Sequence, residues 1–344
     1  TAVGTEQTNA TGSFDNLEAG KYKITATLSD GTTEKKKVEK TINIKNLDDM
    51  SAYLFVHFVD TQEDATREQI YFSVSKDGKT WTTLNNKQPY LTSNVGTQGV
   101  RDPYILRGED GKFFIIATDL SVYNLKNNWT AAAQQGSKSI VVWESSDLVN
   151  WSEASLVKIN NDNAGCTWAP EACYDPEKDE YMVFWASVVS DDSYQKYRIY
   201  RSYTKDFKTF SAPELYIEEP NAVIDTTIID HEGTYYRFTK NEAKSSITMQ
   251  ECTSLSGDWK DVASYNLGSM TGYEGPTIYK LNGKNEWCLL LDYFSKSKGY
   301  KPFVTTDITK GEFTADSDFS FDGTYRHGTV MPITQAEYES LTAE

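Results

Sequence analysis

Acidic side chains recur at the start of four similar segments of this sequence. The segments are "RDPYIL", "WAPEACYD", "IDTTIID" and "EGPTIYK", and their carboxylates are Asp102, Glu171, Asp225 and Glu274. Two carboxyl groups about 6.5 to 9.5 Å apart can hydrolyse a glycosidic bond with inversion, one as general base and one as general acid. A third carboxylate beside the acid raises the pKa of the acid and keeps it protonated. The set predicts sugar hydrolysis, provided that the fold brings the segments together.

A repeat in the sequence predicts such a fold. Five alternating apolar segments, such as "GKFFIIATD" and "GTYYRFTKN", are each followed by a further strand, a turn and a closing aromatic residue. The closing residues are Trp81, Trp151, Phe210, Trp259 and Phe313. Their spacing of roughly 50 to 70 residues suits four short strands and their turns, which is the size of a propeller blade. We therefore expect an all-β protein with a five-bladed β-propeller.

The ring is expected to close with strands from both ends of the repeat region. The last short segment, "RHGTVMPI", lies near the C-terminus, whereas the apolar strand that matches it, "AYLFVHFVD", lies near the N-terminus. One blade must combine the two, as in other closed propellers. Because the innermost strand of each blade lines the central axis, the four carboxylates should meet there with Arg101, Arg326 and His327.

Five motifs of the sequence resemble those of glycoside hydrolase family 43, in the order in which the family has them. They are "VRDPYIL", "TWAPEACYD", "VIDTTIID", "YEGPTIYK" and "RHGTVMPIT". The family consists of five-bladed propellers that cleave arabinose, xylose and related sugars from plant polysaccharides, and the resemblance covers about residues 50 to 344. It implies that Asp102 is the general base and Glu274 the general acid. It also implies that Asp225 orients the acid and tunes its pKa.

The resemblance implies binding roles for further residues. Trp168 matches a tryptophan that shapes the sugar pocket. His327 matches a central histidine that holds a calcium ion in several members, which makes His327 the candidate metal ligand and calcium a candidate structural cofactor. Calcium prefers oxygen ligands, so one imidazole is a poor ligand for it by itself. Arg326, with Arg101 nearby, could hydrogen-bond a sugar hydroxyl or neutralise the acidic residues.

Residues 118–139, "TDLSVYNLKNNWTAAAQQGSKS", are expected to form an insertion at the rim of the site. Its Tyr123 and Trp129 could stack on a sugar ring. Release of α-L-arabinofuranose is the preferred activity, because it is widespread in the family. A β-xylosidase, a β-galactosidase or galactanase, and a non-catalytic carbohydrate-binding propeller stay open as alternatives.

The composition restricts the partners. The chain has 344 residues and a formal net charge of −16, with 50 acidic and 34 basic residues. Such a surface repels nucleic acid and anionic membranes, so an uncharged oligosaccharide or polysaccharide is the expected partner. No apolar run approaches the length of a membrane span. With cell-wall polymers as substrates, we expect secretion or attachment to the cell surface.

Residues 1–48 differ from the rest of the chain. Their alternating pattern, with turns at Leu-Glu-Ala-Gly and Ser-Asp-Gly, predicts two or three antiparallel strands. They resemble the second half of an immunoglobulin-like module, which needs about seven strands and about 100 residues. We therefore expect a partial immunoglobulin-like β module or linker at 1–48, a catalytic propeller at 49–344, and further modules of a longer polypeptide.

Overall fold

The computed structural model describes residues 20–29, 34–44, 49–60 and 64–343. The chain forms two compact units, Thr1–Met50 and Ser51–Glu344. In the first unit, β1 (Gly20–Ser29) pairs antiparallel with β2 (Glu34–Ile44) to give a two-stranded sheet. The immunoglobulin-like assignment stays a prediction, because residues 1–19, 30–33 and 45–48 lie outside the described residues.

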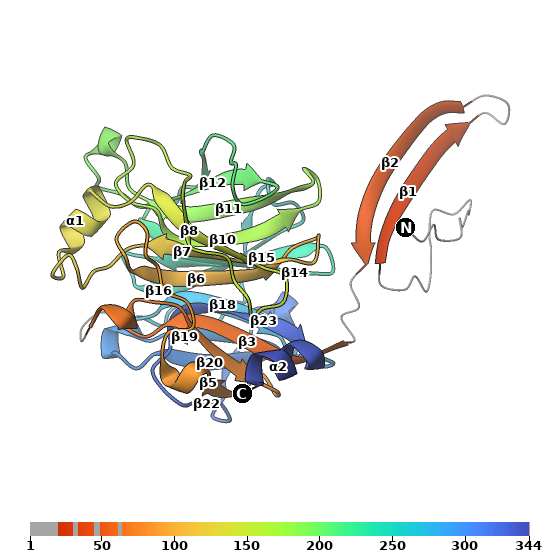
Figure 1. Cartoon of the computed structure of the whole chain (residues 1–344). Coiled ribbons are helices and arrows are strands. Elements are labelled where there is room, and N and C mark those ends of the chain that lie inside the picture. The colour runs from red at the N-terminus through yellow and green to blue at the C-terminus, as the bar shows by residue number, and fades with distance from the viewer. Residues whose placement is uncertain (1–19, 30–33, 45–48, 61–63, 344) are drawn as a thin grey trace. The chain divides into compact units, whose positions relative to one another are not determined.

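Five sheets make up the second unit, and they form the five-bladed β-propeller that the repeat predicts (Figure 1). Four of them follow the order of the chain from the inner strand outwards. They consist of β6 (Val100–Arg107), β7 (Phe113–Asp119), β8 (Ser139–Ser145) and β9 (Ser155–Lys158); β10 (Trp168–Asp175), β11 (Glu180–Ser187), β12 (Arg198–Thr204) and β13 (Glu214–Ile217); β14 (Val223–His231), β15 (Thr234–Asn241), β16 (Ser246–Cys252) and β17 (Lys260–Asp261); and β18 (Glu274–Lys280), β19 (Trp287–Asp292), β20 (Tyr300–Thr305) and β21 (Thr314–Ala315).

The fifth blade combines strands from distant parts of the chain. It consists of β23 (Arg326–Thr334), β3 (Met50–Phe58), β4 (Tyr71–Ser75), β5 (Thr80–Thr83) and β22 (Ser320–Phe321). This arrangement confirms the predicted closure. The inner strands contact one another in the order β6, β10, β14, β18, β23 and back to β6. The ring of five blades is therefore closed.

Two α-helices and five short 3-10 turns complete the described part of the chain. They are α1 (Trp129–Gln134), α2 (Gln335–Thr342), η2 (Ala65–Arg67), η3 (Asn85–Lys87), η4 (Ser190–Asp192), η5 (Phe294–Lys296) and η6 (Ile308–Lys310). A capping box of Thr334 and Glu337 starts α2, and Glu337 also accepts a hydrogen bond from Arg107 of β6 at 2.7 Å. Among the described residues, no helix has both the length and the apolar character of a membrane span.

The turn between the third strand and the closing aromatic residue explains the sequence repeat. In the fifth blade, Asp77 accepts hydrogen bonds from the backbone N–H groups of Lys79 and Thr80 at 2.8 and 2.7 Å. The carboxylates of Asp147 and Asp206 accept backbone N–H groups in the same way two and three residues further on. An aspartate thus fixes each of these turns through its side chain.

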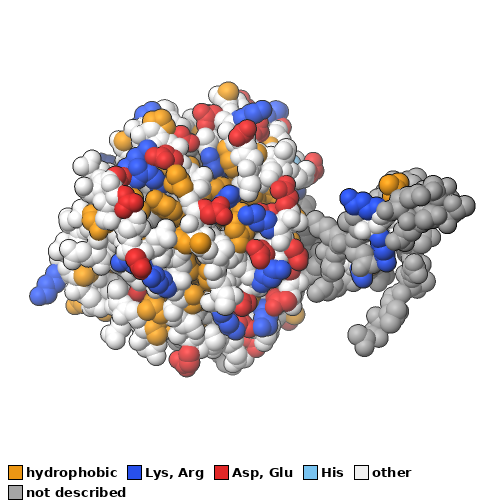
Figure 2. Space-filling view, turned by 90° about the horizontal axis from the view of Figure 1, so that it is seen from above, with side chains coloured by type: hydrophobic (Ala, Val, Ile, Leu, Met, Phe, Trp, Pro, Cys, Tyr) orange, Lys and Arg blue, Asp and Glu red, His pale blue; other side chains and the backbone are white. Residues whose placement is uncertain are grey.

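Apolar side chains of neighbouring blades hold the ring together. One buried cluster combines Ile116 of β7 with Trp185 of β11, and another combines Phe55 of β3 with Leu290 of β19. Close packing of this kind between second strands fixes neighbouring blades relative to one another. On the face in Figure 2, acidic and basic side chains are interspersed, with hydrophobic side chains between them.

Candidate active site

Backbone bulges shape the inner strands where they carry the predicted site residues. In β6, β10, β14 and β18 the register with the second strand shifts, and one residue at the shift has a positive φ. These residues are Asp102 (51°), Ala169 (48°), Asp225 (50°) and Gly275 (51°). A bulge re-aims side chains, and a positive φ costs a residue other than glycine of order 1 to 3 kcal/mol. The fold therefore holds Asp102 and Asp225 in conformations that a regular strand would avoid.

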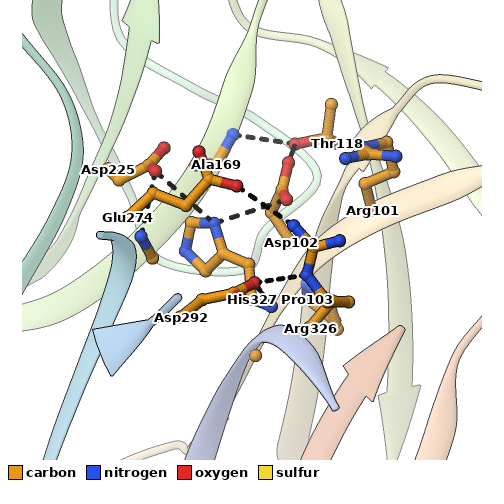
Figure 3. Close-up of polar contacts among 12 residues, drawn as sticks. Arg101, Asp102, Pro103, Thr118, Ala169, Asp225, Glu274, Asp292, Arg326 and His327 are labelled. Carbon is orange, nitrogen blue, oxygen red and sulfur yellow. Dashed lines mark hydrogen bonds and ion pairs between the residues drawn. The ribbon is translucent and has the colours of Figure 1, made fainter. Parts of the chain in front are cut away.

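Asp102 is held as an anion. Its Oδ2 accepts a hydrogen bond from Thr118 Oγ1 at 2.9 Å, and its Oδ1 lies 3.4 Å from His327 Nδ1 (Figure 3). Burial alone would raise the pKa of Asp102, but the hydrogen bond and charge of His327, with Arg101 and Thr118, hold it below its usual value. A buried carboxylate that keeps its charge can accept a proton.

Asp225 faces the same histidine from the other side. Its Oδ2 lies 3.9 Å from His327 Nδ1 and accepts a hydrogen bond from the N–H of Gly275 at 3.1 Å. Burial raises the pKa of Asp225 to about 6, His327 and Lys240 oppose this shift, and the charge of Glu274 adds to it. Asp225 is therefore electrostatically linked to Glu274.

Glu274 contacts a cation with each of its oxygens. Lys240 Nζ lies 3.0 Å from Oε2, and Arg326 Nη2 lies 3.3 Å from Oε1. The side chain of Glu274 is 20% exposed, against 14% for Asp102 and 8% for Asp225. Of the three predicted catalytic carboxylates, Glu274 is thus the most open to a ligand.

His327 lies between the carboxylates. Burial would lower its pKa, but Asp225, Asp102 and Glu171 together raise it to about 9, so the ring is an imidazolium at neutral pH. Gly275 makes room for this ring, because a Cβ at position 275 would lie 2.7 Å from His327 Cγ.

The donor set does not match a dedicated calcium site. Among the residues that the structure describes, no group of three or more His, Cys, Asp or Glu side chains is arranged to hold a metal ion. Calcium prefers oxygen ligands, and one imidazole is a poor ligand for it by itself. The calcium implied by the family resemblance stays a prediction.

Glu171 of β10 is buried beside these groups. The residue is 4% exposed, and within the described part of the chain its Oε2 has no hydrogen-bond partner. Burial raises the pKa of Glu171 to about 8, so this side chain is a neutral acid at pH 7.

The two predicted arginines have different surroundings. Arg326 donates from Nε to Asp292 Oδ2 at 2.6 Å and contacts Glu274 with Nη2, so it belongs to the site. Arg101 donates from Nη1 to the buried Glu68 at 3.0 Å, and its guanidinium lies over the ring of Phe58. The charge of Arg101 also acts on Asp102, where it helps to lower the pKa, so Arg101 lies close to the proposed base; its role in substrate binding stays a prediction.

Aromatic side chains gather at the rim. Trp129 meets Trp168 edge-on with ring centroids 6.1 Å apart, and Trp168 stacks on Tyr197 at 5.4 Å. Trp129 and Tyr123 are 46% and 42% exposed, so they are open to a ligand. A pocket of about 350 Å³ between α1 and the blades includes Trp168 and Asp119 in its wall.

A family model described as "Probable glycosyl hydrolase domain", for the group related to glycoside hydrolase family 43, matches residues 48–339. The chain belongs to the glycosyl hydrolases related to family 43. This membership confirms the resemblance found in the sequence motifs.

Relatives of this family 43-related chain include an α-L-arabinofuranosidase of Bifidobacterium longum subsp. longum. It is 30% identical over 345 residues, which cover 86% of this chain and 32% of that protein. The chain thus spans about a third of that relative. The structure of the GH43 BlXynB protein from Bacillus licheniformis matches with a TM-score of 0.50 and 17% identity, over 83% of this chain and 55% of that chain. A thermostable family 43 glycoside hydrolase matches with a TM-score of 0.48 and 19% identity, over 68% and 77%.

Three site residues of this family 43-related chain were not predicted from its sequence. Thr118, Lys240 and Asp292 lie on second strands and contact Asp102, Glu274 and Arg326 respectively. For Lys240 and Asp292 the signal available was a charged residue inside an apolar strand, as in "YRFTK" and "CLLLD". Such residues are rarely buried unless they are paired.

Proposed function

We propose that this chain is an inverting glycoside hydrolase that releases α-L-arabinofuranose from plant cell-wall polysaccharides or oligosaccharides. The observation that carries the proposal is that Asp102 and Glu274 lie on inner strands that are not neighbours. β23 lies between β18 and β6 around the ring. Inversion requires the two carboxyl groups to lie roughly 6.5 to 9.5 Å apart, and carboxylates on inner strands that a third strand separates can meet this requirement.

Asp102 is the proposed general base. The neighbouring His327 helps to keep it charged. In the reaction it accepts a proton from the water that attacks the anomeric carbon, on the face of the sugar opposite to the leaving group.

Glu274 is the proposed general acid, and it must deliver a proton to the leaving oxygen. In the free protein Lys240 and Arg326 contact its two oxygens. We propose that the bound sugar takes Arg326 away from Oε1 through a hydroxyl group, so that a proton can occupy this oxygen. Asp225 lies close enough to Glu274 for the charge of Glu274 to add to the raised pKa of Asp225, so the two carboxylates are electrostatically linked.

The choice of arabinofuranose rests on the name of the Bifidobacterium longum relative and on the open aromatic rim. Trp129 and Tyr123 offer exposed faces on which a neutral sugar ring can stack. The net charge of −16 supports an uncharged polymer as the partner, met outside the cell.

Proton NMR of the anomeric signals tests the proposal directly. The protein is incubated with an aryl α-L-arabinofuranoside, an aryl β-D-xyloside, an aryl β-D-galactoside and an arabinose-substituted polysaccharide. We expect arabinose with inverted configuration. Retained configuration would overturn the mechanism, and hydrolysis of the xyloside or galactoside alone would overturn the choice of sugar. If none of the substrates is hydrolysed, the proposed activity is overturned and the alternative of a non-catalytic carbohydrate-binding propeller is favoured.

Three variants assign the roles. Asp102→Asn and Glu274→Gln should each lower kcat by roughly 10²- to 10⁴-fold, the usual contribution of a general acid or base. Asp230→Asn changes an exposed carboxylate at the outer end of β14 and should leave kcat unchanged. Activity like that of the wild type in either of the first two variants contradicts the assignment.

A further inference from the structure

The hydroxyl of Thr118 connects two blades at the proposed general base. Thr118 lies on β7 and is fully buried. Its Oγ1 accepts a hydrogen bond from the N–H of Ala169 on β10 at 2.7 Å and donates one to Asp102 Oδ2 at 2.9 Å (Figure 3). The Thr118 hydroxyl thus links the backbone of β10 directly to the carboxylate of Asp102 on β6.

The direction of the two hydrogen bonds follows from their chemistry. A backbone N–H can only donate, so Thr118 must accept from Ala169. The single hydroxyl hydrogen of Thr118 is then directed at the carboxylate of Asp102, which accepts it. The bulge in β10 makes the N–H of Ala169 available, because the register with β11 passes from Trp168 directly to Glu171.

The same position on the second strand serves the site in two other blades. Thr118 lies opposite Arg101 in the β6–β7 register, Lys240 opposite Ile224 and Asp292 opposite Glu274. Each of these three side chains contacts the inner strand of the next blade: Thr118 contacts Ala169, Lys240 contacts Glu274 and Asp292 contacts Arg326. These second-strand residues thus form a layer behind the residues that line the axis.

We propose that Thr118 is a positioning residue for the general base: it fixes the plane of the Asp102 carboxylate relative to the neighbouring blade. The inference rests on the proposed function, since it assigns Asp102 the role of base. Thr118 donates a hydrogen bond to one oxygen of Asp102, and the other oxygen faces His327. These two contacts restrict rotation of the carboxylate group. A fixed carboxylate presents its lone pairs in the productive direction.

The test compares Thr118→Val, Thr118→Ser and Thr239→Val with the wild type. Valine keeps the shape of threonine but removes the hydroxyl, whereas serine keeps it. Thr239 is a matched control, because it is a buried second-strand threonine whose hydroxyl hydrogen-bonds another threonine, Thr226, in place of a carboxylate. We expect Thr118→Val to lower kcat by roughly 10- to 100-fold with little change in KM, the size of effect that a hydrogen bond to a charged group can have. Thr118→Ser and Thr239→Val should stay within about threefold of the wild type.

The outcomes separate this inference from the function itself. If Asp102→Asn is inactive while Thr118→Val turns over like the wild type, only the positioning role is overturned. It is also overturned if Thr118→Ser is as impaired as Thr118→Val, since the hydroxyl then has no part in the effect. If Thr118→Val is unfolded at the assay temperature, Thr118→Ala replaces it with the same expected result. If the wild type hydrolyses nothing, the proposed function fails and this inference fails with it.

Discussion

The ammonium group of Lys240 on β15 lies 3.0 Å from Oε2 of Glu274 on β18, so two neighbouring blades meet at the proposed general acid. The same ammonium group lies 2.8 Å from Oε2 of Glu242, and the side chain of Lys240 is only 3% exposed. A buried charge is tolerated where it is paired in this way. Lys240 therefore has a part in both stability and the site.

Replacement of Lys240 by methionine should lower the free energy of unfolding by about 1 to 3 kcal/mol, because Glu274 loses one of its two cationic partners and keeps only Arg326. Unfolding in urea measures the change. Lys244→Met is the matched control, since Lys244 is an exposed lysine close by in the sequence, and it should change stability little. A loss in Lys240→Met no larger than in this control would show that the pair contributes nothing.

Gly275→Ala should displace the imidazole ring of His327. The new Cβ would lie 2.7 Å from His327 Cγ, and φ at this position is +51°. We expect a loss of roughly 1 to 3 kcal/mol in unfolding free energy from backbone strain, together with a large fall in kcat. Gly283→Ala separates the two effects, because Gly283 has a φ of +67° and a Cβ added there would meet no side chain or backbone of a distant residue within 4 Å. Equal kinetics in the two variants would contradict the role of Gly275 in making room for His327.

Glu68→Gln should loosen the rim insertion. Each oxygen of Glu68 accepts two hydrogen bonds near 3.0 Å: Oε1 from Arg101 and the N–H of Val122, and Oε2 from the hydroxyl of Ser121 and the N–H of Tyr123. In glutamine an NH₂ group replaces one of the two carboxylate oxygens. Because NH₂ is itself a donor, it cannot accept the two hydrogen bonds that this oxygen accepts.

We expect Glu68→Gln to lose about 3 kcal/mol of stability and to raise KM, since Tyr123 lies on the segment that is released. Urea unfolding and steady-state kinetics measure the two effects. Glu153→Gln, at an exposed position, should behave like the wild type. If Glu68→Gln is as stable as the wild type, the four hydrogen bonds of the carboxylate do not contribute to stability as proposed.

Stability should fall as pH rises from about 6.5 to about 9. The unfolded chain releases the His327 proton near pH 6.5, whereas the folded protein keeps it up to about 9, where Asp102, Asp225 and Glu171 face the ring. The raised pKa therefore stabilises the fold fully below pH 6.5, and this contribution of roughly 3 kcal/mol is lost as pH passes through 9. Glu171, with a pKa of about 8, changes stability in the same direction between pH 4.5 and 8.

Urea unfolding at a series of pH values measures this slope, and His327→Gln should remove most of it above pH 8. The alkaline limb of kcat/KM should also lie near pH 9, because Asp102 loses its cationic partner there. Stability that does not change between pH 6.5 and 9 would contradict the charged state of His327.

The sequence predicted the ring and its closure from features that are local or periodic. The aspartate turns before closing aromatic residues such as Trp81 recur from blade to blade, and the unmatched segment "RHGTVMPI" required a partner strand from the other end. Asp102, Asp225, Glu274, Arg326 and His327 were expected together, and the structure brings them together.

The contacts that cross between blades could not be predicted. The Arg101 guanidinium bonds to Glu68, which belongs to a different blade and a segment with no repeat signature. Lys240 and Thr118 contact residues of the next inner strand, and such contacts depend on how adjacent sheets are staggered. A periodic pattern fixes the face on which a side chain lies, but not the atom that it meets on the neighbouring sheet.

The centre of the propeller is nearly balanced in charge within a strongly acidic chain. Asp102 and Asp225 flank the imidazolium of His327, and Glu274 and Asp292 are each paired with Arg326, with Lys240 on the far side of Glu274. These partners lie within 4 Å of one another, well inside the screening length of about 8 Å at physiological ionic strength. A neutral sugar can therefore enter and leave without exchanging counter-ions, and turnover should depend little on salt although the whole chain carries a net charge of −16.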